Sequence, residues 1–398
     1  MLATKLSIQV NKSMLGSTLM RLPRLLRYSF LPIADGAYSR FSLQRTAVML
    51  LFWPVFLLYL IVTGLCLALD HLLFPRFKQI AIQQPLFVIG IPRSGTTFLH
   101  RLLAADQERF TTMTLQELIF APSISQRLCW RALAQLDHRL GSPATKTIQW
   151  LEKRVFSPLD GVHSTRLDDP EEDYLALAPL LNCFLLILPF GDPRFMTLST
   201  FDRDASPQQK QDLARFYRGL IQRHLFVHGT DNTYLSKNPS FTPMLQTLAE
   251  AFPDARFVAC LRNPNQAVPS QVSSILMGAR LFSGQLDTHW WRANLMRMLQ
   301  FYYQHLMQNL PALGAHRHAF VRMEQLAEAP QATVSELYQS FELPLSTRYQ
   351  NQLQQEEASA RRYQSGHRYQ GDTLGITTQD LQQQFGFVYD QLGYGLPE

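Results

Sequence analysis

A glycine-bounded loop carries the strongest chemical signal in the sequence. It reads Gly90-Ile-Pro-Arg-Ser-Gly95-Thr-Thr, between the apolar run Pro85–Gly90 and a run with helical spacing, Thr97–Ala105. A buried strand that ends in such a loop and leads directly into a helix presents the free N–H groups of the first helical turn to an anion. The sequence therefore predicts a phosphate-binding loop at residues 90–97.

The side chains of this loop suit one phosphate group better than a triphosphate. Arg93 can hold phosphate oxygens in a fork, and Thr96 and Thr97 add hydroxyl donors. Gly90 and Gly95 are expected to let the backbone approach a ligand closely. The lysine that a nucleoside-triphosphate loop places before its Ser/Thr is missing, because Thr96 stands there. We therefore expect a ligand with a single 5′ phosphate group.

A second candidate anion site follows another strand pattern. The run Arg256–Leu261 delivers Arg262 to its carboxyl end, where parallel α/β sheets bind ligands, and Ser270 comes eight residues later. Taken alone, Arg262 is better explained as a solvated surface residue. Its combination with the phosphate loop favours a second site for an anion.

The loop resembles a known family. GIPRSGTT is similar to the 5′-phosphosulfate-binding loop of sulfotransferases that use PAPS (3′-phosphoadenosine 5′-phosphosulfate). Its arginine is similar to that of tyrosylprotein sulfotransferases and many bacterial members. The resemblance implies that Arg93, Ser94, Gly95, Thr96 and Thr97 hold the 5′ phosphosulfate. It also implies that the co-substrate is PAPS, that PAP is the product, and that no metal is required.

Two further segments resemble the same family. The Arg-Asn-Pro run at 262–264, with Ser270 eight positions on, resembles the 3′-phosphate-binding element, so Arg262 would pair with the 3′ phosphate and Ser270 would donate a hydroxyl. The run Tyr234–Phe241 looks like the family's Lys-x-Pro segment. Lys237 is then a catalytic candidate that bridges the transferring sulfonate and the leaving phosphate, together with Arg93. The alternative for Lys237 is an ordinary surface lysine.

Transfer to a hydroxyl also needs a base that takes the acceptor's proton. Glu117 is the first candidate, because tyrosylprotein-sulfotransferase-like members place an acidic base at this point after the loop. Its apolar neighbours in sequence predict a raised pKa. His163 is the second candidate, since histidine is the base in soluble relatives. The structural alternatives are a surface glutamate on a helix and a structural histidine.

An acidic run and an apolar run follow one another near the middle of the chain. The run Asp168–Asp173 resembles the family's Pro-Glu-Glu-Asp segment, and most of its charges are expected to cap a helix, although Glu172 can reach the acceptor pocket. The helix would continue over Tyr174–Phe190, which is nearly all apolar but contains Pro179 and Asn182. We expect a buried or membrane-facing wall there, which suits a lipid-like acceptor alcohol.

A membrane segment is predicted near the N-terminus. Residues 47–69 carry no charge, and 23 residues at about 1.5 Å each can cross a hydrocarbon layer of about 30 Å. The basic residues before them predict a cytoplasmic N-terminus, so a single span would export the domain, whereas PAPS is made in the cytosol. A Golgi enzyme with imported donor resolves this conflict. The conflict is also resolved in a bacterium if the apolar segment, interrupted at Pro54, forms a hairpin or a monotopic insert in the inner membrane, because the domain then stays cytosolic. We expect this bacterial arrangement.

The charge distribution and the cysteine spacing argue against several classes of function. The net charge of +6 comes from residues 1–46, which hold seven basic side chains and one acid, while the rest of the chain balances. No basic face is implied for the main domain, so we expect no nucleic-acid partner. The four cysteines show no paired spacing and no Cys/His cluster, so neither a disulfide framework nor a zinc site is expected.

These patterns predict one α/β domain behind a membrane segment. Alternating strand and helix patterns favour a P-loop-type parallel β-sheet flanked by helices, the sulfotransferase fold, with an N-terminal membrane helix. We assign 1–46 to a basic amphipathic segment, 47–70 to a transmembrane or membrane-inserted segment, and 84–398 to the sulfotransferase domain, with 346–398 as its helical closing segment. The expected function is sulfuryl transfer from PAPS to a hydroxyl. The alternatives are a P-loop kinase-like phosphotransferase and a non-catalytic membrane-anchored nucleotide-binding protein.

Overall fold

A five-stranded parallel sheet forms the centre of the molecule. The computed structural model describes Gly16 and residues 18–33, 36–38, 40–156, 166–360 and 374–395. The strand order is β2-β3-β1-β4-β5. The strands are β1 (Leu86–Gly90), β2 (Phe110–Thr111), β3 (Thr233–Lys237), β4 (Arg256–Leu261) and β5 (His318–Arg322). All neighbouring pairs run parallel.

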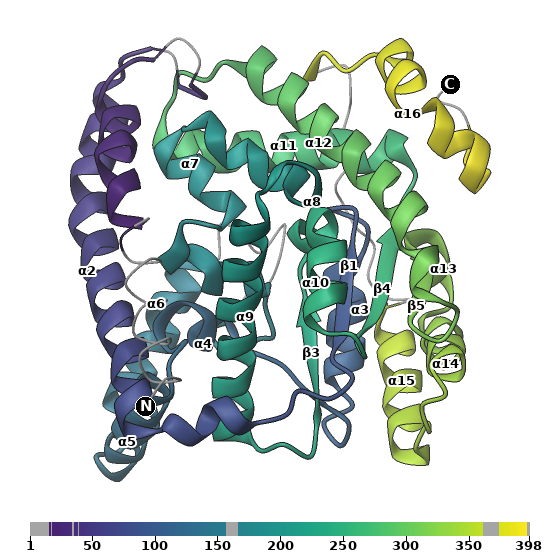
Figure 1. The fold of residues 1–398 in the computed structure, drawn as a ribbon, viewed down its shortest axis with the longest axis horizontal. Helices are drawn as coiled ribbons and strands as arrows, with labels where there is room; N and C mark the ends of the chain where they lie inside the picture. The colour runs from purple at the N-terminus through teal and green to yellow at the C-terminus, as the bar shows by residue number, and fades with distance from the viewer. Residues whose placement is uncertain are drawn as a thin grey trace.

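Helices surround this sheet (Figure 1). The numbered α-helices of the described residues are α2 (Leu43–Leu73), α3 (Thr96–Ala104), α4 (Leu115–Phe120), α5 (Ile124–Arg139), α6 (Pro143–Phe156), α7 (Ile187–Phe190), α8 (Phe201–Asp204), α9 (Pro207–His228), α10 (Leu245–Ala251), α11 (Pro264–Phe282), α12 (Thr288–Asn309), α13 (Met323–Glu328), α14 (Pro330–Ser340), α15 (Thr347–Ala360) and α16 (Thr378–Leu392). The 3-10 helices are η1 (Pro75–Gln79), η3 (Asp173–Leu180), η4 (Phe184–Leu186), η5 (Pro193–Thr200), η6 (Pro239–Met244) and η7 (Pro311–Leu313). Residues 18–30 form a further helix.

The central strand places the phosphate loop. All five residues of β1 are buried, and β1 pairs with β3 on one side and β4 on the other. From β1 the chain runs to β2 at one edge of the sheet, returns to β3 beside β1, and then crosses to β4 and β5 on the other side of β1. Ligands of parallel sheets bind at the carboxyl ends of the strands where this direction changes. The loop after β1 and the last residues of β3 and β4 meet at that point.

Helix α2 is longer and straighter than the sequence predicts. It continues through Pro54 from Leu43 to Leu73, so the hairpin alternative is wrong. By length and composition it could cross a membrane, and the bent pair Asp173–Leu180 and Phe184–Phe190 passes the same test only if both halves count as one span. Figure 1 shows α2 lying along one side of the domain, and it contacts α5, α11, η1 and η3. Its outer face carries exposed leucines, among them Leu51, Leu58 and Leu65.

Buried charges fasten both ends of α2 to the domain. Near its start, Arg45 donates to the carbonyl oxygens of Tyr28, Pro189 and Phe190 at 2.9–3.0 Å. Near its end, Asp70 is fully buried and pairs with Arg223 at 2.8 Å. Asp70 also accepts the first N–H groups of α5, where the helix dipole favours a negative charge. Both ends are therefore part of the domain's buried polar structure.

The apolar run after the acidic segment is a buried wall rather than one helix. It divides into η3, η4 and α7, with a bend of 60° between its halves. Pro179 and the left-handed backbone of Leu181 (φ +56°) end the first half. Leu177, Ile187 and Phe190 are fully buried. The expected wall is confirmed, and the run is interrupted near Pro179 and Asn182, because proline removes a helical N–H donor.

Candidate functional site

The phosphate loop joins β1 to the N-terminus of α3. Gly95 is the N-cap of α3 in a left-handed conformation (φ +84°), and Thr96 and Thr97 begin the helix. The first N–H groups of a helix lack partners within it, so they are available to an anion. Arg93 also has a left-handed backbone (φ +67°), which is uncommon for a residue with a side chain. The local geometry suits the predicted phosphate site.

The two loop glycines are required by neighbouring protein atoms. The sequence interpretation instead explains them by the close approach of a ligand. A Cβ on Gly90 would collide with the backbone of Cys260 on β4, and one on Gly95 would collide with the sulfur of Met323. Ser94 is fully buried, and its hydroxyl donates toward the carbonyl oxygens of Ile91 and Cys260 at 2.5 and 2.9 Å. The backbone N–H of Ser94 also bonds to Ile91 O at 3.2 Å. Ser94 therefore shapes the loop from inside.

Direct hydrogen bonds connect the loop to the second predicted anion site. Arg93 Nε donates to Ser270 Oγ at 3.1 Å, and Arg262 Nη1 donates to the carbonyl oxygen of Arg93 at 2.8 Å. Arg262 leaves the end of β4, and Ser270 lies on α11, which starts two residues after Arg262. The structure thus brings together three residues that the sequence placed in two separate elements.

Lys237 ends β3 and is fully buried beside the loop. Its Nζ contacts Thr97 Oγ1 at 3.3 Å, Glu171 Oε1 at 3.0 Å and Glu172 Oε1 at 3.1 Å. The alternative of an ordinary surface lysine is therefore wrong. Burial lowers the pKa of Lys237, but the carboxylates of Glu172 and Glu171 outweigh it and raise that pKa. Lys237 is a fixed cation at the loop.

The acidic run serves this lysine rather than capping a helix. Glu172 is the N-cap residue of η3, yet its side chain makes no capping bond. Burial raises the pKa of Glu172, and the charge of Lys237 only partly offsets that effect. Asp173 accepts hydrogen bonds from Tyr217 and Tyr234, and burial raises its pKa to about 6. The expectation that these charges mostly cap a helix is wrong.

Glu117 lies in a separate cluster. It belongs to the capping box of α4 and pairs with Arg127 of α5 at 3.3 Å. It also accepts a hydrogen bond from His228 at 2.6 Å, and its other oxygen is 3.5 Å from His224 Nδ1. Burial alone would raise its pKa, but Arg127 and both histidines outweigh burial and hold that pKa far below the usual range. The raised pKa expected for Glu117 is therefore wrong.

The same cluster has a metal-like composition that the sequence did not reveal. One ligand-type atom from each of Glu117, His224 and His228 lies within 4.8 Å of the others. The histidines are four residues apart on the last turns of α9, so they share a face. Burial lowers the pKa of His224 to about 4, so it is neutral. The buried guanidinium of Arg127 already supplies positive charge here, which disfavours a divalent cation.

Sequence reasoning missed some residues of the site. His163 lies outside the described residues, so its proposed role stays a prediction. Glu171 was not singled out, although it contacts Lys237 as closely as Glu172 does. Glu171 and Lys237 are 66 residues apart in the sequence. The only sequence feature that could have indicated their contact was the Pro-Glu-Glu-Asp run. Asn238, directly after Lys237, is fully buried and was also missed.

Known proteins are similar to this chain in sequence and in fold. A model described as "Sulfotransferase family" matches residues 85–347. Omega-hydroxy-beta-dihydromenaquinone-9 sulfotransferase Stf3 of Mycobacterium bovis is 24% identical in an alignment of 365 positions that covers 86% of this chain and 84% of that protein. The protein of the same name from Mycobacterium tuberculosis gives the same values.

Two solved structures show the same architecture. Sulfotransferase STF9 from Mycobacterium avium has a TM-score of 0.69 and 17% identity, covering 85% of this chain and 84% of that one. Sulfotransferase STF1 from Mycobacterium tuberculosis H37Rv has a TM-score of 0.67 and 19% identity, covering 95% and 92%. The predicted parallel sheet flanked by helices is confirmed as the sulfotransferase fold. Because the family model also spans more than half of the sequence, the chain belongs to the sulfotransferase family.

Proposed function

We propose that this enzyme transfers the sulfuryl group of PAPS to the hydroxyl of a lipid-like acceptor while attached to a membrane surface. One observation carries the proposal: Arg93 bonds to Ser270, Arg262 bonds to the Arg93 carbonyl, and Lys237 contacts Thr97. The residues expected to hold the two ends of a bisphosphorylated adenosine thus form one connected site. The N-terminus of α3 would hold the 5′ phosphosulfate, and Arg262 with Ser270 the 3′ phosphate.

The charges around Lys237 fit sulfuryl transfer. In such a transfer, the bond from sulfur to the acceptor oxygen forms as the bond from sulfur to the 5′-phosphate oxygen breaks, and negative charge grows on the departing phosphate. Fixed cations near that oxygen stabilise the transition state because they need no reorganisation. Lys237 is buried and held by three groups, and Arg93 lies in the loop that faces the same ligand. We assign both as the cations that stabilise the departing phosphate.

We further propose Glu172 as the base that takes the acceptor proton. Its carboxylate lies 3.1 Å from Lys237 Nζ, and its pKa is raised by burial. A raised pKa brings a carboxylate nearer to the operating pH, which suits proton abstraction. The role of Glu117 as base stays a prediction, but its ion pair with Arg127 favours Glu172. Glu171, also paired with Lys237, would remain the charged partner of the lysine.

The membrane attachment that we propose is monotopic, with α2 lying in the plane of the surface. A helix of 31 residues is about 46 Å long, more than a hydrocarbon layer of about 30 Å requires. Because Arg45 and Asp70 fasten both of its ends to the domain, α2 cannot cross a bilayer without carrying neighbouring parts of the domain into it. Its apolar outer face can instead sink into one leaflet. The domain then stays on the side where the nucleotide is made.

The lipid-like acceptor rests on two observations. The relative Stf3 is named for a hydroxylated dihydromenaquinone, and a wall of buried apolar residues follows the acidic run directly. The test is transfer of sulfur-35 from labelled PAPS to lipid extracts of the source cells, followed by mass spectrometry of the labelled product. We expect one sulfated lipid. Label found only on soluble sugars would contradict the lipid acceptor, and no transfer at all would contradict the enzyme assignment.

A further inference from the structure

A cavity lies beside the helix at residues 18–30. It has a volume of about 590 Å³, within the size range of small-molecule sites. Residues 18–30, η5 and α8 enclose it, together with the end of η3. Apolar side chains line part of it, together with three arginines and three aspartates, and Arg24 and Asp192 among them form an ion pair at 2.7 Å. The apolar residues are Leu25, Leu180, Leu181, Phe195, Leu198 and Phe201. We call this the outer cavity.

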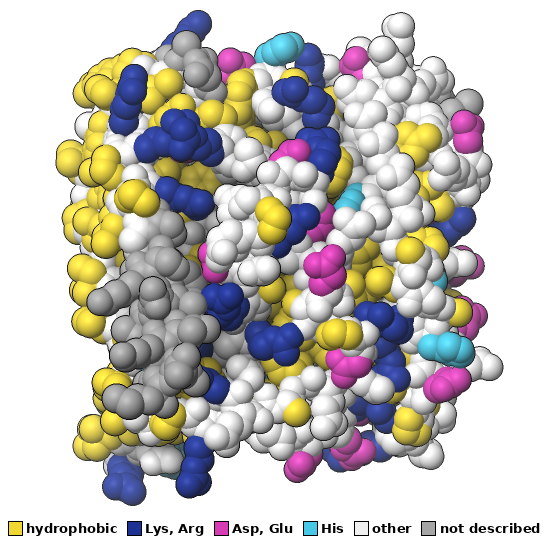
Figure 2. All heavy atoms as spheres, viewed as in Figure 1, with side chains coloured by type: hydrophobic (Ala, Val, Ile, Leu, Met, Phe, Trp, Pro, Cys, Tyr) yellow, Lys and Arg dark blue, Asp and Glu magenta, His cyan; other side chains and the backbone are white. Residues whose placement is uncertain are grey.

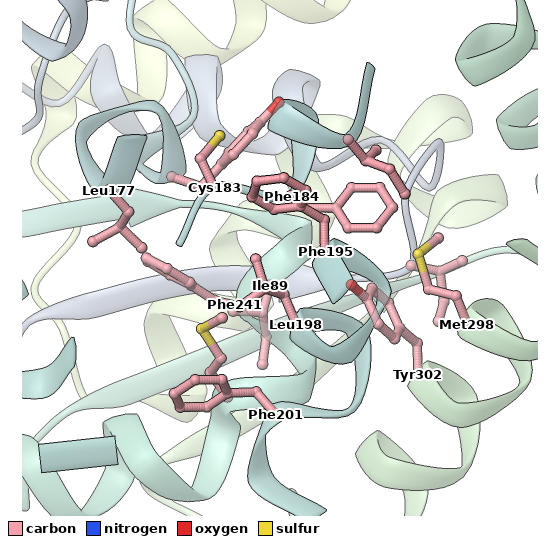
Figure 3. Close-up of a cluster of buried hydrophobic side chains, with 14 of the residues drawn as sticks. Ile89, Leu177, Cys183, Phe184, Phe195, Leu198, Phe201, Phe241, Met298 and Tyr302 are labelled. Atoms are coloured by element: carbon pink, nitrogen blue, oxygen red, sulfur yellow. The ribbon is translucent and has the colours of Figure 1, made fainter. Parts of the chain in front are cut away.

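A second, much smaller cavity adjoins the outer cavity and is lined by Asn238, the residue that follows Lys237. It holds about 10 Å³, roughly the space of one water molecule. Asn182 and Leu198 line both cavities, so they form the partition between them. The other residues of this inner cavity include Asn238 and Tyr174, next to Lys237 and two residues after Glu172 respectively. Figure 3 shows Leu198 in the apolar cluster with Leu177, Phe184, Phe241 and Tyr302, which also line the inner cavity.

The inner cavity contains an unsatisfied donor. Asn238 is fully buried, and its Oδ1 accepts a hydrogen bond from the Ser240 N–H at 2.9 Å. Its Nδ2 is buried and has no hydrogen-bond partner. An unpaired buried donor costs about 1–3 kcal/mol, so it points to an acceptor atom that is present when the site is filled. Asn238 directly follows Lys237 in the sequence, so the donor belongs to the residue next to the end of β3 that carries this lysine.

The mouth of the outer cavity opens beside the proposed membrane surface. Arg21 and Arg24 line it from the helix at 18–30, and Arg21 also reaches Asn182 at 3.5 Å. That helix packs on α2, where Trp53 Nε1 donates to Ser29 Oγ at 3.0 Å. Figure 2 shows apolar side chains along the edge where α2 lies, with Lys and Arg side chains gathered next to them. This combination suits an amphiphile that arrives from a lipid surface with anionic headgroups.

We propose that the two cavities form the acceptor site for an amphipathic alcohol with a long apolar chain. The chain lies in the outer cavity, and the hydroxyl end passes between Asn182 and Leu198 to reach the inner one. Asn238 Nδ2 donates to the hydroxyl oxygen, which holds that oxygen beside Lys237 while its proton goes to Glu172. This proposal rests on the proposed function, and it adds the route, the chain site and the residue that positions the hydroxyl.

Photolabelling tests the route without relying on turnover. The full-length protein in detergent micelles is irradiated with a hexadecanol analogue that carries a diazirine in mid-chain, and labelled peptides are mapped by mass spectrometry. We expect label on the segment that contains Leu180 and Leu198. Ala205→Trp fills the outer cavity and should lower this labelling at least tenfold. Ala214→Trp, at another half-buried alanine outside the cavity lining, is the matched control and should keep it.

The possible results distinguish a failure of the acceptor route from a failure of the proposed sulfotransferase function. Label confined to α2, or unchanged by Ala205→Trp, would overturn the route. If that variant fails to fold, Thr197→Trp fills the same cavity from an exposed position. The proposed function fails instead if the wild type takes up no PAP, whatever the labelling shows.

A second variant tests the contact at Asn238. Asn238→Asp keeps an oxygen for the Ser240 N–H and removes the amide donor. We expect the KM for a long-chain alcohol to rise about tenfold, which corresponds to one lost hydrogen bond of about 1.4 kcal/mol, while PAP affinity measured by calorimetry stays unchanged. An unchanged KM would show that Asn238 does not contact the acceptor, and a loss of PAP affinity would show that it serves the nucleotide instead.

Discussion

The phosphate loop and helix α2 both depend on buried charged side chains, but they use them differently. On α2, Arg45 bonds to three carbonyl oxygens, and Asp70 is occupied by Arg223 and by the first N–H groups of α5. At the loop, Lys237 contacts a hydroxyl and two carboxylates that a reaction can protonate or displace. The charged side chains of α2 hold the helix in place, whereas those at the loop are available to take part in a reaction.

This difference explains what each region tolerates. A buried ion pair fully enclosed by the protein is costly to break, because removing one partner leaves an unpaired charge. We therefore expect changes at the ends of α2 to act on stability. Changes at Lys237 and its neighbours should act mainly on catalysis, and changes on the outer face of α2 on membrane binding.

Lys237→Met gives the largest expected effect. Removing the cation that we assign to the departing phosphate should lower kcat by about 100- to 1,000-fold, as losses of transition-state donors do. PAP affinity should fall much less, because Arg93, Arg262 and Ser270 remain. Steady-state kinetics and PAP calorimetry measure the two effects. A kcat within threefold of wild type would remove Lys237 from the mechanism, with Lys146→Met at an exposed position as the control.

Glu172→Gln and Glu117→Gln compare the two candidate bases. Loss of a general base should lower kcat by about 100-fold or more in Glu172→Gln. Glu117→Gln should instead lower the thermal midpoint, because Arg127 loses its buried partner. The reverse pattern, with catalysis lost only in Glu117→Gln, would restore the first sequence-based candidate.

The pH profile of kcat sharpens the same comparison. A base works only when deprotonated, so activity is present above its pKa and is lost as the pH falls through it. An ordinary glutamate has a pKa of about 4.3. Because burial raises the pKa of Glu172, this loss of activity should occur at a higher pH than that value. Glu172→Gln should abolish this limb of the profile. A limb that persists in the variant would assign it to another group.

The outer face of α2 should control membrane binding. Replacing Leu51, Leu58 and Leu65 by glutamate puts three charges on one exposed stripe. Each leucine is worth about 1.5–3 kcal/mol when fully buried, so the triple variant should lose tenfold or more in vesicle affinity. Flotation with vesicles of mixed neutral and anionic lipids measures it. Transfer to a short-chain alcohol should not change.

A control separates this effect from added charge alone. Glutamates at the exposed polar positions Gln350, Asn351 and Gln354 of α15 add the same charge elsewhere and should leave flotation unchanged. Equal losses in both triple variants would contradict a specific membrane face on α2.

Ser270→Ala should give the smallest effect. It removes the hydroxyl that accepts from Arg93 and that we propose for the 3′ phosphate. One hydrogen bond contributes about 0.5–1.5 kcal/mol, so PAP affinity should fall by about twofold to tenfold. Calorimetry with PAP and with adenosine 5′-phosphate measures the difference. A similar loss for both nucleotides would place Ser270 at the 5′ end instead.

The residues of the proposed nucleotide side could be selected from the sequence because local patterns contain them. Gly90 to Thr97, and Arg262 with Ser270, each lie within a few residues of a strand end, and the strand Arg256–Leu261 was predicted with its observed bounds. The residues of the proposed acceptor side could not be predicted in this way, because they contact one another across long distances in the sequence. Arg24 pairs with Asp192 across 168 residues, and Lys237 with Glu171 across 66. The direction of the pKa shift of Glu117 could not be predicted, because its partners, Arg127 and the histidines of α9, meet it only in the folded chain.

The central claim is that one connected site binds both phosphates of PAP. Calorimetric titration of the wild type and of Arg93→Ala with PAP, and of the wild type with ATP, tests it most directly. We predict that the wild type binds PAP, that ATP binds far more weakly, and that Arg93→Ala weakens PAP about tenfold or more, because the bond it removes is charge-assisted. Absence of PAP binding in the wild type, or equal affinity in Arg93→Ala, would contradict the account.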